Sequence, residues 1–112
     1  MITLYHNPRC SKSRQAFNLL EEKGFDVDVK LYLEKPMEKE ILLEAIKQLG
    51  ESVIRKNEAD YRYFIEGENL NEHNLVEMMI AHPKTIERPL VIKDNKMALG
   101  RPIENVIALL QL

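Results

Sequence analysis

The sequence predicts an α/β fold in which a mixed four-stranded sheet is built from two halves, with helices inserted between them. Two observations lead to this expectation. The chain opens with two short β-favouring runs separated by a helical segment, and it closes with a β-hairpin pattern followed by a helix. A βαβ unit places its strands parallel, whereas a hairpin adds antiparallel strands. The stretch between the halves is mostly of helical periodicity, with a weaker pattern over residues 52–64.

The first half reads as strand, helix and strand. The apolar run Ile2-Thr3-Leu4-Tyr5 stops at Asn7-Pro8, which is typical of a strand that ends in a tight loop. A helix is expected from Ser11 or Lys12 to Lys23, with Gly24 as its C-terminal stop. Its apolar side is made by Ala16, Phe17, Leu19 and Leu20. The second strand is predicted where apolar and charged residues alternate, at Val27, Val29 and Leu31.

The middle of the chain is predicted to be helical. One helix covers residues 41–49 and ends at Gly50, and residues 52–64 hold two short helices. Asn71 is a suitable N-cap for a further helix that ends before Pro83. The apolar residues at helical spacing are Ile41, Leu42, Ala45, Ile46 and Leu49, and then Leu75, Val76, Met79 and Ile80.

The second half reads as hairpin and helix. Leu90-Val91-Ile92 and Met97-Ala98-Leu99 flank a turn at Asp94-Asn95. Pro102 is expected in the first turn of a last helix, whose apolar positions are Ile103, Val106, Ile107 and Leu110. The order βαβ, helices, ββα is that of a thioredoxin-like fold, with a right-handed crossover. We expect one domain over residues 1–112, with the helical insertion at about 36–86.

Composition excludes several classes of protein. Sixteen basic against eighteen acidic residues give a net charge of −2, which predicts neither nucleic acid nor membrane as a partner. The single cysteine cannot form an internal disulfide, and the first residues lack the pattern of a signal peptide. We therefore expect a cytoplasmic protein. A monomer is expected, since no apolar stripe is left uncommitted, and no metal site, since the three histidines lack ligand spacing with each other or with the cysteine.

Cys10 is the candidate nucleophile. It lies between the first strand and the first helix, where free backbone N–H groups and the helix dipole stabilise a thiolate. Arg9, Lys12 and Arg14 add positive charge nearby, and the same N–H groups suit an oxyanion. The alternative is a small buried hydrophobic residue, the usual role of a free cysteine.

The neighbours of Cys10 have both functional and structural interpretations. His6 either assists the thiol or makes a structural hydrogen bond at the end of the strand. Ser11 and Ser13 are helix caps or substrate contacts, and Arg14 is a supporting residue or simply solvated.

Two arginines later in the chain each precede a proline. The following proline favours extended backbone at Arg88 and Arg101, from which a planar guanidinium can bind an oxyanion through several N–H groups. The alternative is that both are ordinary surface arginines. A cis peptide is one option at Arg88-Pro89.

These motifs together resemble the glutaredoxin-coupled arsenate reductase family. The resemblance rests on Tyr5-His6-Asn7-Pro8-Arg9-Cys10-x-x-Ser13-Arg14, Leu31-Tyr32-Leu33-Glu34, Ile54-Arg55-Lys56-Asn57, His82-Pro83, Glu87-Arg88-Pro89-Leu90-Val91-Ile92 and Gly100-Arg101-Pro102. It covers essentially the whole chain in the right order. The residues that follow the cysteine resemble a Cys-Ser-Lys-Ser branch of the family.

The resemblance implies a site and a reaction. Cys10 corresponds to the nucleophile that forms a covalent adduct with arsenate, and His6 to a residue that supports it. Arg55, Arg88 and Arg101 correspond to the arginines that bind the oxyanion, with Asn7, Ser13 and Arg14 in supporting positions. No bound cofactor is implied. Glutathione is the external reductant and glutaredoxin the partner, which agrees with the lack of a second thiol.

Two other functions remain open on the sequence. One is a glutathione-linked thiol-transfer protein that accepts mixed disulfides at Cys10. The other is a redox-related regulatory binding protein without turnover, although relatives of that kind use Cys-x-x-Cys and here Ser13 occupies the second position.

Overall fold

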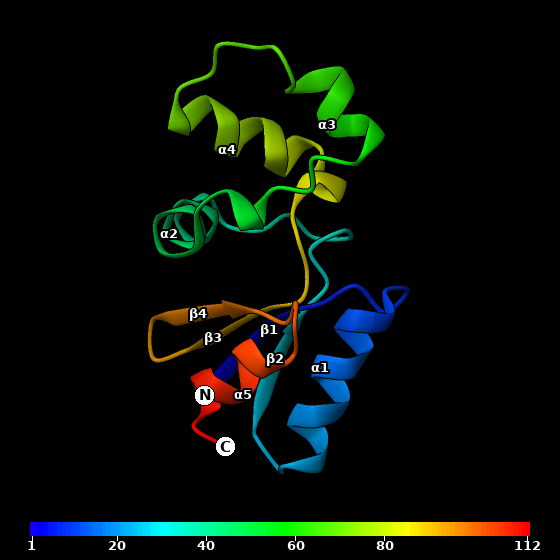
Figure 1. Ribbon diagram of the computed structural model, residues 1–112, viewed down its shortest axis with the longest axis vertical. Helices are drawn as coiled ribbons and strands as arrows, with labels where there is room; N and C mark the ends of the chain where they lie inside the picture. The colour runs from blue at the N-terminus through cyan, green and yellow to red at the C-terminus, as the bar shows by residue number, and fades with distance from the viewer. The chain divides into compact units, whose positions relative to one another are not determined.

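The computed structural model describes residues 1–112, which form two compact units. The first unit contains Met1–Tyr32 and Arg88–Leu112, and the second contains Leu33–Glu87. Figure 1 shows strands and two helices in the first unit and only helical elements in the second. No helix is at once long enough and apolar enough to span a lipid bilayer.

The first unit is built on a four-stranded sheet with the order β2-β1-β3-β4. Strand β1 pairs parallel with β2 and antiparallel with β3, and β3 pairs antiparallel with β4, so the predicted mixed sheet is confirmed. The second strand ends one residue earlier than the predicted alternation, at Lys30. The strands are β1 (Ile2–Tyr5), β2 (Val27–Lys30), β3 (Leu90–Lys93) and β4 (Lys96–Leu99).

The hairpin turn confirms the prediction for Asp94-Asn95. Both residues have positive φ, 51° and 67°, as the turns that match the twist of a hairpin require. Asparagine and aspartate tolerate this conformation better than other side chains, which explains their position here. The peptide bonds Arg88-Pro89 and Arg101-Pro102 are both cis, whereas the sequence suggested the cis form only for the first.

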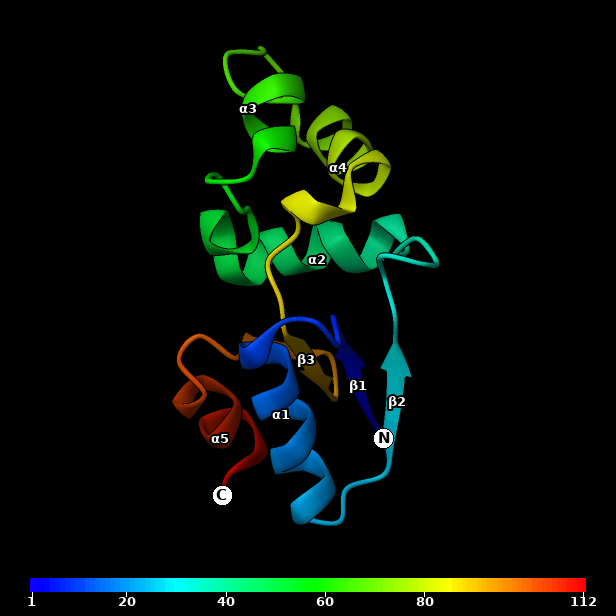
Figure 2. The same cartoon turned by 90° about the vertical axis from the view of Figure 1, so that its right-hand side faces the viewer.

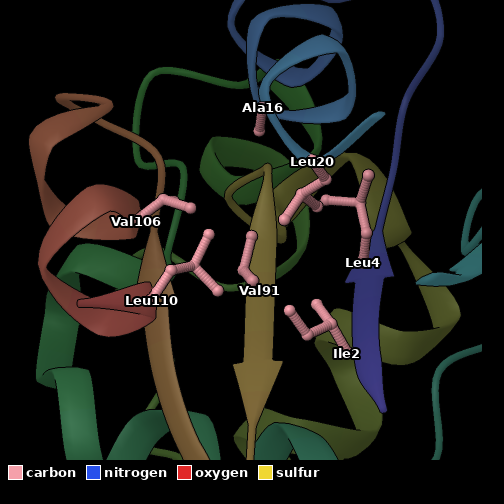
Figure 3. Close-up of a cluster of buried hydrophobic side chains, with 7 residues drawn as sticks. All are labelled: Ile2, Leu4, Ala16, Leu20, Val91, Val106 and Leu110. Atoms are coloured by element: carbon pink, nitrogen blue, oxygen red, sulfur yellow. The ribbon is translucent and has the colours of Figure 1, made fainter. Parts of the chain in front are cut away.

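Helices α1 (Ser11–Glu22) and α5 (Glu104–Leu110) cover one face of this sheet (Figure 2). Their inner residues meet those of β1 and β3 in a single core of Ile2, Leu4, Ala16, Leu20, Val91, Val106 and Leu110 (Figure 3). Complete burial of a leucine such as Leu4 or Leu20 stabilises the fold by about 1.5–3 kcal/mol. This core fixes both ends of the loop that carries Cys10.

The start of α5 differs from the prediction. The helix begins at Glu104, so Pro102 precedes it instead of lying in its first turn. The carbonyl of Pro102 nevertheless accepts a hydrogen bond from the backbone N–H of Asn105 at 3.1 Å. The proline thus ends the preceding segment, and helical hydrogen bonding starts directly after it.

The second unit is helical, as predicted. Gly50 closes the first helix with a φ of +66°, and the side chain of Asn71 caps α4 by accepting from Asn74 N at 2.8 Å. A single antiparallel bridge joins Ile54 and Ile86. The elements are α2 (Lys39–Leu49), η1 (Gly50–Val53), α3 (Ala59–Phe64), α4 (Glu72–Ala81) and η2 (Pro83–Thr85).

Gly100 brings together the two segments that lead into Arg88-Pro89 and Arg101-Pro102. Its backbone N–H donates to the carbonyl of Pro89 at 2.9 Å, and a Cβ at this position would lie 2.7 Å from Pro89 Cγ. Carbon atoms do not approach so closely without displacement, so the contact requires glycine. The position is buried, and the core leaves little room for the ring to move.

We predict that Gly100→Ala lowers the free energy of unfolding by about 1–3 kcal/mol, the usual cost of overpacking. Urea denaturation followed by circular dichroism measures it. A variant with the unfolding midpoint of the parent protein would contradict the close contact between Gly100 and Pro89.

Candidate active site at the start of helix α1

Cys10 is the N-cap residue of helix α1, as predicted, with extended backbone (φ −96°, ψ 124°) and a half-buried side chain. The loop before it is a tight turn. The backbone N–H of Cys10 donates to the carbonyl of Asn7 at 3.0 Å, and Asn7 Oδ1 accepts from the backbone N–H of Arg9 at 3.0 Å. Side-chain and backbone bonds of Asn7 therefore fix the conformation in which the thiol is presented.

Several groups act on the protonation of the Cys10 thiol. Burial acts to raise its pKa. Hydrogen bonds to the sulfur from the backbone N–H of Ser13, the Arg88 side chain and the backbone N–H of Lys12 lower the pKa, and the charge of Arg101 lowers it further. The net result is a pKa below the ordinary value, because hydrogen bonds and positive charge favour the thiolate.

Arg101 brings a second guanidinium to the sulfur, in addition to that of Arg88. Its Nη2 lies 3.2 Å from Cys10 Sγ, while its Nε donates to the carbonyl of Arg88 at 2.7 Å. The guanidinium is therefore anchored to the main chain on one nitrogen and directed at the thiol with another. Arg88 and Arg101, which lie far from Cys10 in sequence, are brought to it by the fold.

The sheet register explains this convergence. Tyr5 at the end of β1 pairs with Leu90 at the start of β3, and Leu90 pairs with Leu99 at the end of β4. The residues just after β1, just before β3 and just after β4 therefore lie at the same edge of the sheet. Those segments carry Cys10, Arg88 and Arg101, respectively.

The cations near Cys10 in sequence do not have the predicted role. No charge of Arg9, Lys12 or Arg14 is among the causes of the lowered thiol pKa, and Lys12 contributes through its backbone N–H alone. Arg14 Nη1 instead donates to the carbonyl of Pro8 at 3.0 Å, so this residue supports the loop. No group of three or more His, Cys, Asp or Glu side chains is gathered as metal ligands would be.

His6 and Ser13 form a buried pair beneath the loop. His6 Nδ1 lies 2.6 Å from Ser13 Oγ, which accepts from the backbone N–H of Asn7 at 3.0 Å. Burial first, and the charge of Arg14 second, lower the pKa of His6 and favour the neutral ring. A neutral Nδ1 then accepts the hydroxyl proton of Ser13. The ring also stacks on Phe17, with centroids 5.4 Å apart.

The geometry decides between the earlier interpretations of these side chains. Ser13 is fully buried, so it is not exposed to a substrate, and its Oγ does not cap α1. Its hydroxyl connects the histidine to the loop, and its backbone N–H reaches the thiol. His6 Nδ1 bonds to the hydroxyl of Ser13, which also accepts from the loop at Asn7 N, as in the structural interpretation of His6.

We predict that Ser13→Ala lowers the free energy of unfolding by about 1–3 kcal/mol, because the buried N–H of Asn7 loses its acceptor. Ser11→Ala is the matched control, since Ser11 is exposed in the same helical turn and should change stability by no more than about 0.5 kcal/mol. Urea denaturation of both variants tests the difference. Equal stabilities would show that the Ser13 hydroxyl does not hold the loop.

Arg55 belongs to the helical unit, where two carboxylates bind it. Its Nη1 lies 2.5 Å from Glu87 Oε1 and its Nε lies 3.3 Å from Glu58 Oε1. Neither glutamate was predicted to be a site residue: Glu87 appeared only within the family motif, and Glu58 was not singled out. A cavity of about 270 Å³ is lined by Ile54, Arg55, Lys56, Asn57 and Glu87.

Comparison with known proteins gives a consistent result over nearly the full chain. The family model described as the ArsC family matches residues 5–109. The chain is 40% identical to the protein YfgD of Escherichia coli strain K12 over 111 residues, covering 95% of this chain and 93% of YfgD. It is 38% identical to an arsenate reductase of Neisseria meningitidis serogroup B strain MC58 over 114 residues, covering 97% of each.

A comparison with a solved structure gives the same family. The chain superposes on the arsenate reductase from Vibrio cholerae with a TM-score of 0.87 at 38% identity, covering 96% of this chain and 95% of the other. The thioredoxin-like fold is thereby confirmed. With a thiol of lowered pKa at the first helix and two arginines beside it, in a chain matched by the family model over residues 5–109, the protein belongs to the ArsC family.

Proposed function

We propose that the protein reduces arsenate through a covalent adduct on Cys10. The observation that carries the proposal is the half-buried thiol with Arg101 Nη2 at 3.2 Å and a lowered pKa. A thiolate is the reactive form of cysteine, and positive groups beside it also attract an oxyanion. The names of the relatives support the same substrate, since several of them are arsenate reductases.

The proposed reaction has a defined balance. The Cys10 thiolate attacks arsenic, an S–As bond forms, and one arsenate oxygen leaves as water after protonation. Two electrons then reduce arsenic from the +5 to the +3 state, as two thiols are converted to one disulfide. Cleavage of the S–As bond by water releases arsenite and regenerates the Cys10 thiol. Because the chain has a single cysteine, at least one of these thiols comes from another molecule.

We propose glutathione as the external reductant, with glutaredoxin as the protein partner and no resident cofactor. The assignment follows from the resemblance of the chain to the glutaredoxin-coupled family and from the missing second thiol. A monomer acting in the cytoplasm is part of the same proposal.

The oxyanion is proposed to bind Arg88 and Arg101, with Arg55 as a third ligand. Arginine presents paired N–H groups in a plane, which match the oxygens of a tetrahedral anion better than a lysine ammonium does. The Arg88 carbonyl already holds the Arg101 side chain in place. Binding of the oxyanion therefore costs little further side-chain entropy at Arg101. His6, Asn7, Ser13 and Arg14 are proposed to act as supports of the Cys10 loop.

The test is arsenate-dependent oxidation of NADPH with glutathione, glutaredoxin and glutathione reductase. Cys10→Ser should abolish turnover, and Arg88→Lys or Arg101→Lys should lower kcat/KM by about 10²–10³-fold despite keeping the charge. Arg62→Lys, an exposed substitution on α3, is the control and should match the parent protein.

Two results would contradict the proposal. Turnover retained in Cys10→Ser would show that Cys10 is not the nucleophile. Parental kinetics in both arginine variants would show that Arg88 and Arg101 are not the anion ligands. A wild-type protein that exchanges thiols with glutathione mixed disulfides but never consumes NADPH with arsenate would support thiol transfer instead.

A further inference from the structure

Arg55 and Glu87 are held opposite each other by the main chain of the helical unit. The backbone N–H of Arg55 donates to the carbonyl of Thr85 at 2.8 Å, and that of Glu87 donates to the carbonyl of Val53 at 2.7 Å. These two bonds flank the bridge between Ile54 and Ile86. The side chains of Val53, Thr85 and Ile86 are almost completely buried, so this short ladder is a fixed part of the unit.

The side chains of Arg55, Glu58 and Glu87 form a partly buried cluster of charges. Arg55 keeps 23% of its side chain exposed, Glu87 17% and Glu58 27%. Nearby, the pair of Lys56 and Glu51 is almost as short at 2.7 Å, but its side chains are 46% and 80% exposed. Screening by water makes such an exposed pair weak, whereas the Arg55 cluster is shielded on several sides.

The charges of the cluster do not favour an anion. One guanidinium and two carboxylates sum to −1 on Arg55, Glu58 and Glu87 together. An arginine acting as a simple point charge would therefore be a poor anion ligand at this position. What the carboxylates supply is orientation. Their contacts engage Nε and Nη1 and leave Nη2 outside both, so the plane of the guanidinium is set before any ligand arrives.

We propose that Glu87 is a positioning residue for oxyanion binding, which acts by fixing the guanidinium of Arg55 with Glu58 as its second support. The inference rests on the proposed role of Arg55 in binding arsenate. Glu87 is itself held in the helical unit, because its backbone N–H donates to the carbonyl of Val53.

The substitution Glu87→Gln changes the KM for arsenate in opposite directions, depending on whether net charge or positioning of Arg55 governs binding. The substitution removes one negative charge, so if net charge governed binding, the KM for arsenate would fall. If positioning governs, the KM rises, because the neutral amide holds the guanidinium more weakly than the carboxylate does. We expect a rise of about tenfold, equivalent to about 1.4 kcal/mol, with kcat changed by less than about twofold.

Steady-state kinetics with arsenate test this inference in four variants. Glu87→Gln is the main variant, and Glu58→Gln should shift the KM in the same direction by a smaller factor, since its contact is longer. Glu51→Gln is the matched control, because it breaks an exposed ion pair in the same unit and should leave both constants unchanged. Arg55→Lys reports on the arginine itself.

The variants separate failure of this inference from failure of the proposed function. If Arg55→Lys raises the KM while Glu87→Gln and Glu58→Gln leave it unchanged or lower it, Glu87 is not a positioning residue and the role of Arg55 stands. If Arg55→Lys also leaves the KM unchanged, Arg55 is not an anion ligand and the inference falls with that assignment. A raised KM in Glu51→Gln would attribute the effect to loss of any ion pair in this unit.

Discussion

Stabilisation of the Cys10 thiolate by the donors and charges around its sulfur is the interaction on which the proposed chemistry depends. A thiol at the start of a helix already receives backbone N–H groups, here those of Lys12 and Ser13. Two guanidinium groups add to them, since the Arg88 side chain donates a hydrogen bond to the sulfur and Arg101 Nη2 lies 3.2 Å from it in a half-buried setting. A charge at that distance and in that environment has a much larger effect than the same charge in open solvent.

The order of the strands in the sheet brings these groups to Cys10. Because β1 and β3 are neighbours at the centre of the sheet and run antiparallel, the segment leaving β1 meets the segment entering β3. The hairpin returns β4 to the same edge. Gly100 and the Arg88 carbonyl then connect the two arginine segments directly, through the bond to Pro89 and the bond to Arg101 Nε. The loop beneath Cys10 is held separately, by Asn7, His6 and Ser13.

Much of this fold was predictable, because its elements carry strong local signals. Alternation, helical spacing and turn residues such as Asp94-Asn95 and Asn71 identified nearly every strand and helix to within a residue or two. Cys10 was predictable too, since a cysteine between a strand and a helix is in an unusual chemical position. The exception at Pro102 is instructive, because a proline that favours a first helical turn equally suits the segment just before one.

The electrostatics of the site were less predictable from sequence. Nearness in sequence pointed to Arg9, Lys12 and Arg14 as the source of charge, but none of their charges is among the causes of the lowered thiol pKa, and Arg14 binds the carbonyl of Pro8. The role of Ser13 depends on its burial against His6, which no pattern in the sequence indicates. The carboxylate supports of Arg55 come from two different segments, and a tertiary pairing between Ile54 and Ile86 is needed to bring Glu87 into place.

Stabilisation of the thiolate is measured directly by the pKa of the Cys10 thiol, obtained from thiolate absorbance against pH in the wild-type protein and in Arg101→Gln. Since the chain has one cysteine, the signal has a single source. We expect a pKa below the unperturbed value of about 8.5 in the wild type and a higher one in the variant. A wild-type pKa at or above that value, or the same pKa in both proteins, would contradict this expectation.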